Sequence, residues 1–283
     1  MNGTLLADIG GTHARFAWAD GQGGHSLPMV LKVADFPRIT DAFAHVGPAR
    51  RALVALAGPV MDGTCVLTNN HWGAVRADAL GLPEVRLLND LEAQAWLLPH
   101  LRPGETRLLS GPAEASAGPM LLINPGTGLG VALYVPGAGA VATEGGHATL
   151  AGADAAEDVV LAALRARFGH ASAERALSGP GFQWLAEAGA ADPDAMFMAL
   201  LAGFCGSAAL STGARGGVFL GGNILNARQA ALDESFIARF LAKGRFRAWL
   251  EAVPLRLITV AEPGLAGLAR LAWQDLPKSA EIA

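Results

Sequence analysis

The chain has 283 residues, of which 52% are hydrophobic and 16% charged, and its formal net charge is -4 with a pI near 6.0. This composition excludes a disordered chain and disfavours a nucleic-acid partner, because binding a phosphate backbone needs clustered Lys and Arg. The length fits one or two domains that share a sizeable core, and two are expected.

The two cysteines, Cys65 and Cys205, lie far apart and outside any C-x-x-C pair. Neither a disulfide framework nor a structural zinc site is indicated, and a cytoplasmic location is expected. The first apolar run is cut by Asp8, which argues against a signal peptide. Of two long uncharged stretches, 115–143 is too rich in Gly and Pro for a membrane span, and 195–214 reads as a buried helix, so no membrane partner is expected.

The first elements are strands that end in polar turns. Residues 4–20 predict two strands around a DIGGT turn, and 51–60 predict another strand that ends at Gly-Pro. Residues 84–90 predict a strand that runs into a helix of apolar spacing, which places Asp90 at the junction. A sheet therefore forms early in the chain.

Residues 102–119 are rich in Gly, Pro, Ser and Ala and mark the best internal boundary. After it, strands alternate with helices, which is typical of α/β proteins. The expected elements are a hairpin at 121–135, helices at 155–169, 181–189 and 195–214, a strand and turn at 216–224, and a helix that starts near 263. We expect a small α/β domain over 1–100 that is completed by a C-terminal helix at 265–283, and a large α/β domain over 101–264.

Two glycine-rich turns interrupt apolar runs in the same way, and this pair is the only self-similarity in the chain. Such turns can direct successive backbone N–H groups at phosphate oxygens, and a threonine adds a hydroxyl donor. Asp8, just before the first turn, could bind Mg²⁺ directly or through water. The alternative is two ordinary Gly-rich hairpins. The turn residues are Gly10, Gly11 and Thr12, then Gly126, Thr127 and Gly128.

Other phosphate-binding folds fit less well. The chain lacks a G-x-x-x-x-G-K-[ST] sequence, which excludes a P-loop. The GTGLG stretch at 126–130 is followed by a strand, whereas a dinucleotide-binding fold needs a helix there.

The remaining polar candidates are weaker when each is taken alone. Asn89-Asp90 at a helix start can be a simple N-cap. Glu144 and His147, separated by two glycines, can hydrogen-bond the hydroxyls of a polyol or form a solvated turn. An acid such as Glu174 in the first turn of a helix is commonplace, and nothing in its residue pattern selects it.

Taken in order, the motifs LADIGGTHAR, ALAGPVMDGTCVLTNNHW, LLNDLEAQA, NPGTGLGVAL, TEGGH, SAERALSGPGF, GGVFLGGNI and KGRFRAWL resemble bacterial glucokinase over nearly the whole chain. The resemblance implies a two-domain actin-like ATPase (ribonuclease H-like) sugar kinase fold with a central cleft that binds nucleotide and sugar. It implies glucose and ATP as ligands, Mg²⁺ as cofactor, and phosphorylation of a hexose at its primary hydroxyl.

The resemblance also assigns roles to residues. It gives the two glycine turns to the phosphates of ATP and the pair Gly221 and Gly222 to the adenosine. It makes Asp90 the catalytic base. The sugar-contacting set that it implies is Asn89, Asp90, Glu144, His147 and Glu174.

The chain departs from the family pattern in three places. Asn223 replaces the third glycine of the adenosine turn, His13 stands where Asn is usual, and the segment between Gly181 and Gly203 is shorter by about one helix. The last departure leaves a homodimer as one alternative for the assembly. The function alternatives are a kinase of mannose, fructose or N-acetylglucosamine, a non-catalytic sugar sensor and an actin-like filament protein, and the phosphoryl donor is open between ATP, ADP and polyphosphate.

Overall fold

The computed structural model describes residues 3–67 and 69–275, which divide into two compact units. Unit 1 consists of residues up to His100 and from Val260 onward, and unit 2 of Leu101–Thr259. Residues 260–264, expected with the large domain, thus group with unit 1. The expected C-terminal helix at 265–283 corresponds to α10, Pro263–Gln274, and positions 276–283 lie outside the described residues.

Unit 1 is built on a five-stranded sheet in the order β3-β2-β1-β4-β8, in which β1, β4 and β8 are parallel. A smaller sheet of β5, β6 and β7 accompanies it. The strands are β1 Thr4–Ile9, β2 His13–Trp18, β3 Met29–Lys32, β4 Arg51–Leu56, β5 Val60–Met61, β6 Thr64–Val66, β7 Ala74–Arg76 and β8 Glu84–Asn89. The helices are α1 Ile39–Val46, α2 Asp90–Ala95 and α10, with 3₁₀ turns η1 Val33–Asp35, η2 Ala77–Ala79 and η3 Leu98–His100.

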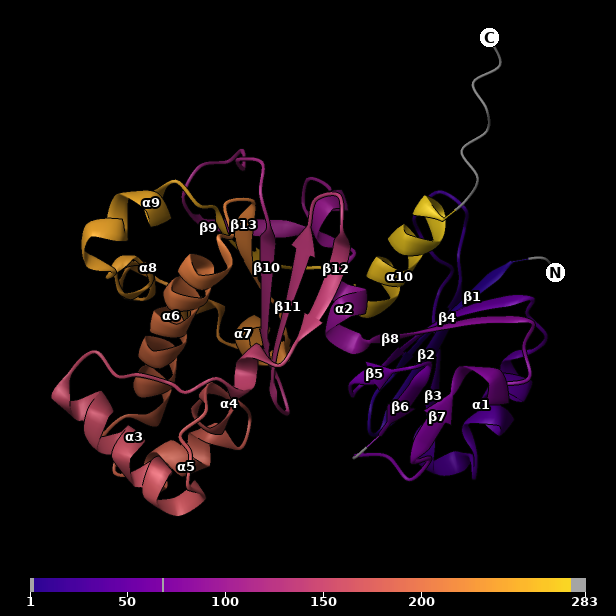
Figure 1. Cartoon of the computed structure of the whole chain (residues 1–283), viewed down its shortest axis with the longest axis horizontal. Helices are drawn as coiled ribbons and strands as arrows, with labels where there is room; N and C mark the ends of the chain where they lie inside the picture. The colour runs from indigo at the N-terminus through magenta and orange to yellow at the C-terminus, as the bar shows by residue number, and fades with distance from the viewer. Residues whose placement is uncertain (1–2, 68, 276–283) are drawn as a thin grey trace, which may run out of the picture. The chain divides into compact units, whose positions relative to one another are not determined.

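Both faces of this sheet are buried, which explains the continuous apolar runs of β1 and β4. Leu5 and Ile9 point into a core shared with α1, whereas Leu6 points into a core shared with α2 and α10. Figure 1 shows α10, at the C-terminal end of the colour scale, among the N-terminal elements that it completes. Elements from the first hundred residues and α10 therefore build one unit.

Unit 2 is built on a six-stranded sheet in the order β12-β11-β10-β13-β14-β9. The strands are β9 Thr106–Ser110, β10 Met120–Pro125, β11 Leu129–Val135, β12 Gly139–Thr143, β13 Gly217–Leu220 and β14 Leu255–Ile258. The helices are α3 Ala155–Phe168, α4 Ala173–Ala176, α5 Gly181–Glu187, α6 Pro193–Thr212, α7 Asn223–Ala227, α8 Glu234–Leu241 and α9 Arg247–Glu251. The 3₁₀ turns are η4 Gly145–His147, η5 Gln229–Ala231 and η6 Gly244–Phe246.

The segment 102–119, expected to mark the boundary where the large domain begins, contains β9, which pairs with β14 at the edge of this sheet. An edge strand has one partner and keeps exposed side chains, so its sequence lacks the apolar run of a central strand. Both sheets share one plan: three consecutive antiparallel strands, followed by two strands that run parallel to the first of them. Each glycine turn joins the first two of these antiparallel strands, β1 to β2 in unit 1 and β10 to β11 in unit 2.

Helix α6 is the long helix of unit 2 (Figure 1). The Asp192 side chain accepts a hydrogen bond from the Ala195 amide at its start, Pro193 follows, and Gly213 ends it with a φ of 61°. Among the described residues it alone is long and apolar enough to cross a membrane, and half of its most apolar stretch is buried in the unit. Its apolar character therefore matches the core position expected for it.

Candidate functional site

In unit 1 the candidate residues lie at one edge of the sheet. Strands β1, β4 and β8 are parallel, so their carboxyl ends meet at the same edge, where ligands of open α/β sheets bind. Asp8 lies near the end of β1, the first glycine turn follows that strand, and Asp90 follows β8. The fold thus gathers residues that lie more than eighty positions apart in the sequence.

Asp8 is held in a site of excess negative charge. Burial raises the pKa of its carboxyl to about 6, and the neighbouring Asp90 and Glu262 act in the same direction. Arg15 opposes them and forms an ion pair of 3.0 Å with Glu262, from Nε to Oε2. A methyl group on Gly264 would lie 2.5 Å from Oδ2 of Asp8, so the carboxylate sits against the first turn of α10.

Asn89 and Asp90 begin helix α2, as a cap at this position requires. The Asn89 Oδ1 accepts hydrogen bonds from the amides of Leu91 and Glu92 at 2.9 and 3.3 Å, and its Nδ2 donates to the carbonyl of Gly58 at 3.1 Å. Asp90 Oδ1 accepts from the Leu91 amide at 3.0 Å. The cap interpretation of Asn89 is therefore confirmed, and the cap fixes the start of the helix that carries Asp90.

The first glycine turn is closed by the Gly10 amide, which donates to the carbonyl of His13 at 3.0 Å. Its glycines adopt no left-handed backbone, so the absence of a side chain is what they provide. A methyl group on Gly11 would lie 2.7 Å from the backbone oxygen of Asn69. Substitution there would force two backbone segments apart.

The second glycine turn, in unit 2, is also pinned by its backbone. The Gly126 amide donates to the Gly128 carbonyl at 2.7 Å, and the Gly179 amide donates to the Gly126 carbonyl at 2.7 Å. One side of Gly126 is open, because a methyl group there would meet no atom within 4 Å. Thr127, at the tip of the turn, is exposed. The turn is thus fixed at its base and free at its tip.

Glu174 connects this turn with the TEGGH segment. Its Oε2 accepts a hydrogen bond from the Leu129 amide at 3.0 Å, while its Oε1 lies 3.9 Å from Nδ1 of His147. Nε2 of His147 lies 3.7 Å from Oε2 of Glu144, and Gly146 packs directly against the Leu129 carbonyl. Three of the five expected sugar-contacting residues therefore form one group in unit 2, beside the second glycine turn.

The pair Gly221 and Gly222 follows strand β13 and lies next to the second turn. The Gly221 amide donates to the Ile123 carbonyl at 3.0 Å, and Gly222, with a φ of 93°, packs against Asn124 and Pro125. Strands β10 and β13 are parallel, so both loops leave the same edge of the sheet. Helix α7 begins at Asn223, the residue that replaces a third glycine.

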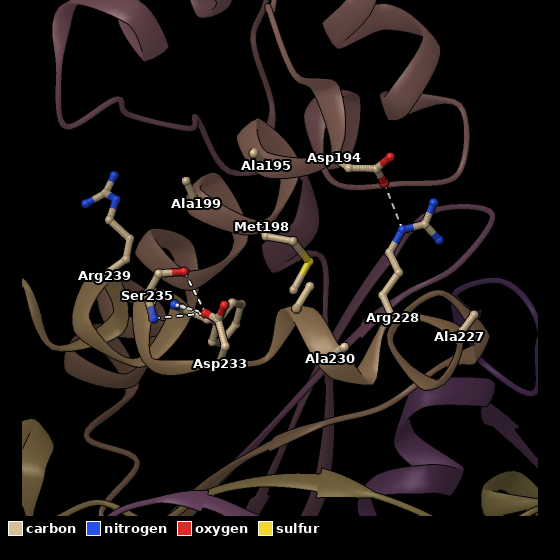
Figure 2. Close-up of a pocket in the computed structure, with 12 residues that line it drawn as sticks. Asp194, Ala195, Met198, Ala199, Ala227, Arg228, Ala230, Asp233, Ser235 and Arg239 are labelled. Atoms are coloured by element: carbon tan, nitrogen blue, oxygen red, sulfur yellow. Dashed lines mark hydrogen bonds and ion pairs between the residues drawn. The ribbon is translucent and has the colours of Figure 1, made fainter.

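A cavity of about 940 Å³ opens at the far end of α7 (Figure 2). Arg228 at its rim pairs with Asp194 at 2.9 Å, and its guanidinium lies 4.3 Å from the centre of the Phe182 ring. Met198, Phe236 and five alanines form the apolar part of its lining. The lining residues are Asp194, Ala195, Met198, Ala199, Ala227, Arg228, Ala230, Ala231, Asp233, Ser235, Phe236 and Arg239.

Several residues of these surroundings were not expected from the sequence. Asn69 and Asn70 contact the first turn, and Arg15, Glu262 and Gly264 surround Asp8. The motif ALAGPVMDGTCVLTNNHW contains both asparagines and matches the family, so it could have directed attention to them, although no role was assigned to it. No signal pointed to Glu262 and Gly264, because their distance in sequence from Asp8 hides the contact.

Comparisons with known proteins are consistent across nearly the whole chain. The Glucokinase family model matches residues 5–195 and 190–275. A glucokinase from Paramagnetospirillum magneticum is 38% identical over 98% of both chains, and the crystal structure of a glucokinase from an Antarctic psychrotroph is 29% identical with a TM-score of 0.85 over 97% of this chain and 99% of that one. The two matched stretches meet within the segment 181–203 that the sequence indicates to be short.

More distant proteins share the fold. A ROK family glucokinase from Streptomyces griseus, solved in complex with glucose and AMPPNP, is 21% identical with a TM-score of 0.58 and covers 96% of this chain and all of that one. The chain also spans about half of a bifunctional protein from Burkholderia orbicola, at 36% identity over 96% of this chain and 49% of the relative. The expected two-domain sugar kinase fold is confirmed, and the chain belongs to the glucokinase family.

Proposed function

We propose that this chain transfers the γ-phosphoryl group of ATP to O6 of glucose. The observation that carries the proposal is the repeated plan of the two units, which puts a glycine turn at the same strand connection in each, with carboxylates next to both. A pair of such turns suits a polyphosphate, and the carboxylates suit sugar hydroxyls. The glucose and AMPPNP bound by the Streptomyces griseus relative fit the same pair of ligands.

In this proposal Asp90 accepts the proton of the sugar's primary hydroxyl as the new O–P bond forms and the γ-phosphoryl leaves the β-phosphate. Glu144, His147 and Glu174 hold the other hydroxyls. Asn89 contributes chiefly as the cap that fixes the start of α2, since its side chain bonds Leu91, Glu92 and Gly58. Most of the rate enhancement then comes from positioning.

The phosphates would be bound by amides and the threonine hydroxyls of the two turns. Asp8 would hold Mg²⁺ together with phosphate and water oxygens, and Mg²⁺ when bound would neutralise charge on the phosphates. The fit is supported by the raised pKa of Asp8, which Asp90 and Glu262 help to cause and which a divalent cation would offset. The described residues hold no group of three His, Cys, Asp or Glu side chains suited to a metal, so a single carboxylate is the ligand proposed.

The adenosine would lie along Gly221 and Gly222, with its base directed past α7 into the cavity. Helix α7 has five residues, so the cavity begins about 7 Å from the glycine pair. Ala199→Trp should obstruct part of the cavity and raise the KM for ATP several-fold while the KM for glucose stays unchanged. An unchanged KM for ATP would place the base elsewhere.

We place the enzyme in the cytoplasm because Cys65 and Cys205 are free and buried, as thiols of a reducing compartment are. The hexose alternatives, mannose, fructose and N-acetylglucosamine, stay open because the sugar set reads hydroxyl geometry. The donor alternatives, ADP and polyphosphate, stay open because glycine turns bind phosphates of many kinds.

A coupled assay over glucose and the three other sugars, with ATP, ADP and polyphosphate as donors, tests the proposal. Glucose with ATP should give the highest kcat/KM. A sugar phosphorylated as well as glucose would overturn the specificity, and binding of glucose without turnover would favour a sensor.

Asp90→Asn should lower kcat by about a hundred- to ten-thousand-fold, the usual range for a general base, and leave glucose binding intact. Isothermal titration with glucose checks the binding. Turnover near that of the unmodified chain would remove Asp90 from the mechanism.

A further inference from the structure

The segment that follows β6 packs on the first glycine turn, although the proposed reaction gives it no role. Asn70 is half-buried there, and its Nδ2 donates a hydrogen bond to the carbonyl of Gly10 at 3.1 Å. The preceding residue, Asn69, lies against Gly11 with its backbone oxygen. The turn at 69–72 therefore covers one side of the glycine turn.

The orientation of the Asn70 amide is determined by its other bond. Its Oδ1 accepts from the backbone amide of Trp72 at 2.9 Å, so Nδ2 is the group left to face Gly10. The Trp72 indole donates to the Phe36 carbonyl at 2.8 Å, which anchors the segment to the body of unit 1. The donor is thus held in place from two sides.

A bond on the Gly10 carbonyl has a consequence for the next amide. The peptide between Gly10 and Gly11 is planar and trans, so its C=O and its N–H point in opposite directions. Fixing the carbonyl toward Asn70 fixes the Gly11 N–H away from it. The carbonyl of Thr12 is tied in the same manner by the Val33 amide at 3.0 Å.

We propose that Asn70 is a positioning residue that orients the Gly11 amide toward a phosphate oxygen of the nucleotide. The proposal rests on the proposed function, in which this turn binds the triphosphate. Asn70 itself touches no substrate. It acts by preventing the flexible Gly10-Gly11 peptide from turning its carbonyl, which would repel an anion, into the position of its amide.

Asn70→Asp is the sharpest test, because it keeps an acceptor for the Trp72 amide and replaces only the donor that faces Gly10. We expect the Kd of AMPPNP with Mg²⁺, measured by isothermal titration, to rise at least tenfold. Asn70→Ala should raise it about three- to tenfold without adding a charge, because the hydrogen bond from the Gly11 amide to the anion is weakened rather than lost. Asn70→Gln, which retains the amide donor, should restore part of the affinity.

The control is His71→Ala in the same turn, since the His71 ring contacts the Phe36 carbonyl, which the Trp72 indole continues to hold in the variant. It should bind AMPPNP and glucose as the unmodified chain does. For the Asn70 variants the KM for ATP should rise while the KM for glucose and the melting temperature stay unchanged, a split that a merely structural role would not produce.

An equal loss of affinity for AMPPNP and for glucose would overturn the assignment, as would an unchanged Kd for AMPPNP in Asn70→Asp and Asn70→Ala. Failure of the proposed function is recognised separately, because the unmodified chain would then not bind AMPPNP or would not phosphorylate a sugar.

Discussion

The two carboxylate oxygens of Glu174 have different partners. One oxygen accepts from the Leu129 amide beside the second glycine turn, and the other lies near His147. A carboxylate bonds sugar hydroxyls more strongly than an amide does, but both can accept from a backbone N–H. The two contacts can therefore be separated by substitution.

We expect Glu174→Gln to raise the KM for glucose about tenfold and to leave the KM for ATP nearly unchanged, because the Leu129 amide keeps an acceptor. Glu174→Ala should raise both the KM for glucose and the KM for ATP. Steady-state kinetics with each substrate varied in turn gives the measurement, and Glu187→Gln, which alters an exposed acid paired with Arg167, is the control. Equal effects of the Gln and Ala variants would contradict the two-contact view.

The raised pKa of Asp8 predicts how the stability of the folded chain depends on pH. Its pKa is about 6 in the folded protein against an ordinary 3.8, so the folded state binds a proton more tightly between those values. Stability therefore falls as the pH rises from about 4 to 6, and the full cost, about 1–3 kcal/mol, remains above pH 6.

Asp8→Asn should remove that cost. In urea unfolding without nucleotide, the variant should be more stable than the unmodified chain at pH 7 by about 1–3 kcal/mol and equally stable near pH 4, while losing activity. The same difference at both pH values would show that ionisation of Asp8 is not the cause.

Close contacts at glycines bring helices together in both units, and one of them supports α2, which begins at the proposed base Asp90. Gly267 of α10 packs directly on the backbone oxygen of Ala93 in α2, the helix that starts at Asp90. In unit 2, α3 and α8 are joined by a partly buried pair in which Arg239 donates to Glu157 at 2.8 Å, beside Gly203 of α6. Glycine thus permits close packing in two different ways, against backbone and against a side chain.

The same substitution at these two glycines should have unequal effects. Gly267→Ala forces backbone atoms apart, and we expect a loss of about 1–3 kcal/mol in unfolding free energy together with a lower kcat. Gly203→Ala meets only the end of the Arg239 side chain, which can move, and it should be nearly neutral because alanine favours a helix. Urea unfolding and the kcat of both variants test this expectation. Equal losses of unfolding free energy would contradict the distinction between packing against backbone and packing against a side chain.

Unit 2 is built from one segment of the chain, whereas unit 1 is built from two. Unit 2 is one uninterrupted segment with its own large core, whereas one core of unit 1 depends on Leu265, Leu268 and Leu271 of α10. Each of these side chains contributes about 1.5–3 kcal/mol when fully buried. Unit 1 therefore cannot be complete without the second pass of the chain.

A fragment of residues 101–259 should unfold cooperatively on its own, as followed by circular dichroism. A fragment of residues 1–100 should not, and adding a peptide of residues 260–275 should restore a cooperative transition. Cooperative unfolding of 1–100 alone would show that α10 is dispensable for that unit.

Much of the candidate site can be predicted from the sequence because its parts are formed by residues that are neighbours in the chain. The glycine turns, the Asn89 cap and the strand-to-helix junction at Asp90 each arise from neighbouring residues, and the structure places them where the pattern predicts. Family motifs added Glu174, whose own residue pattern selects nothing. The roles of these residues in catalysis remain predictions for the experiments above.

Periodicity and motif order, which are encoded residue by residue, were sufficient to predict the α/β class, the two hairpins, the buried helix α6 and the family. Three features are seen only in the folded chain: β9 joins a sheet, Glu262 and Gly264 lie beside Asp8, and Asn70 bonds the Gly10 carbonyl. Those contacts join segments between 50 and 260 residues apart, and their energy depends on distances that no local pattern records. Packing therefore supplied the partners of each reactive group, whereas local chemistry supplied the groups themselves.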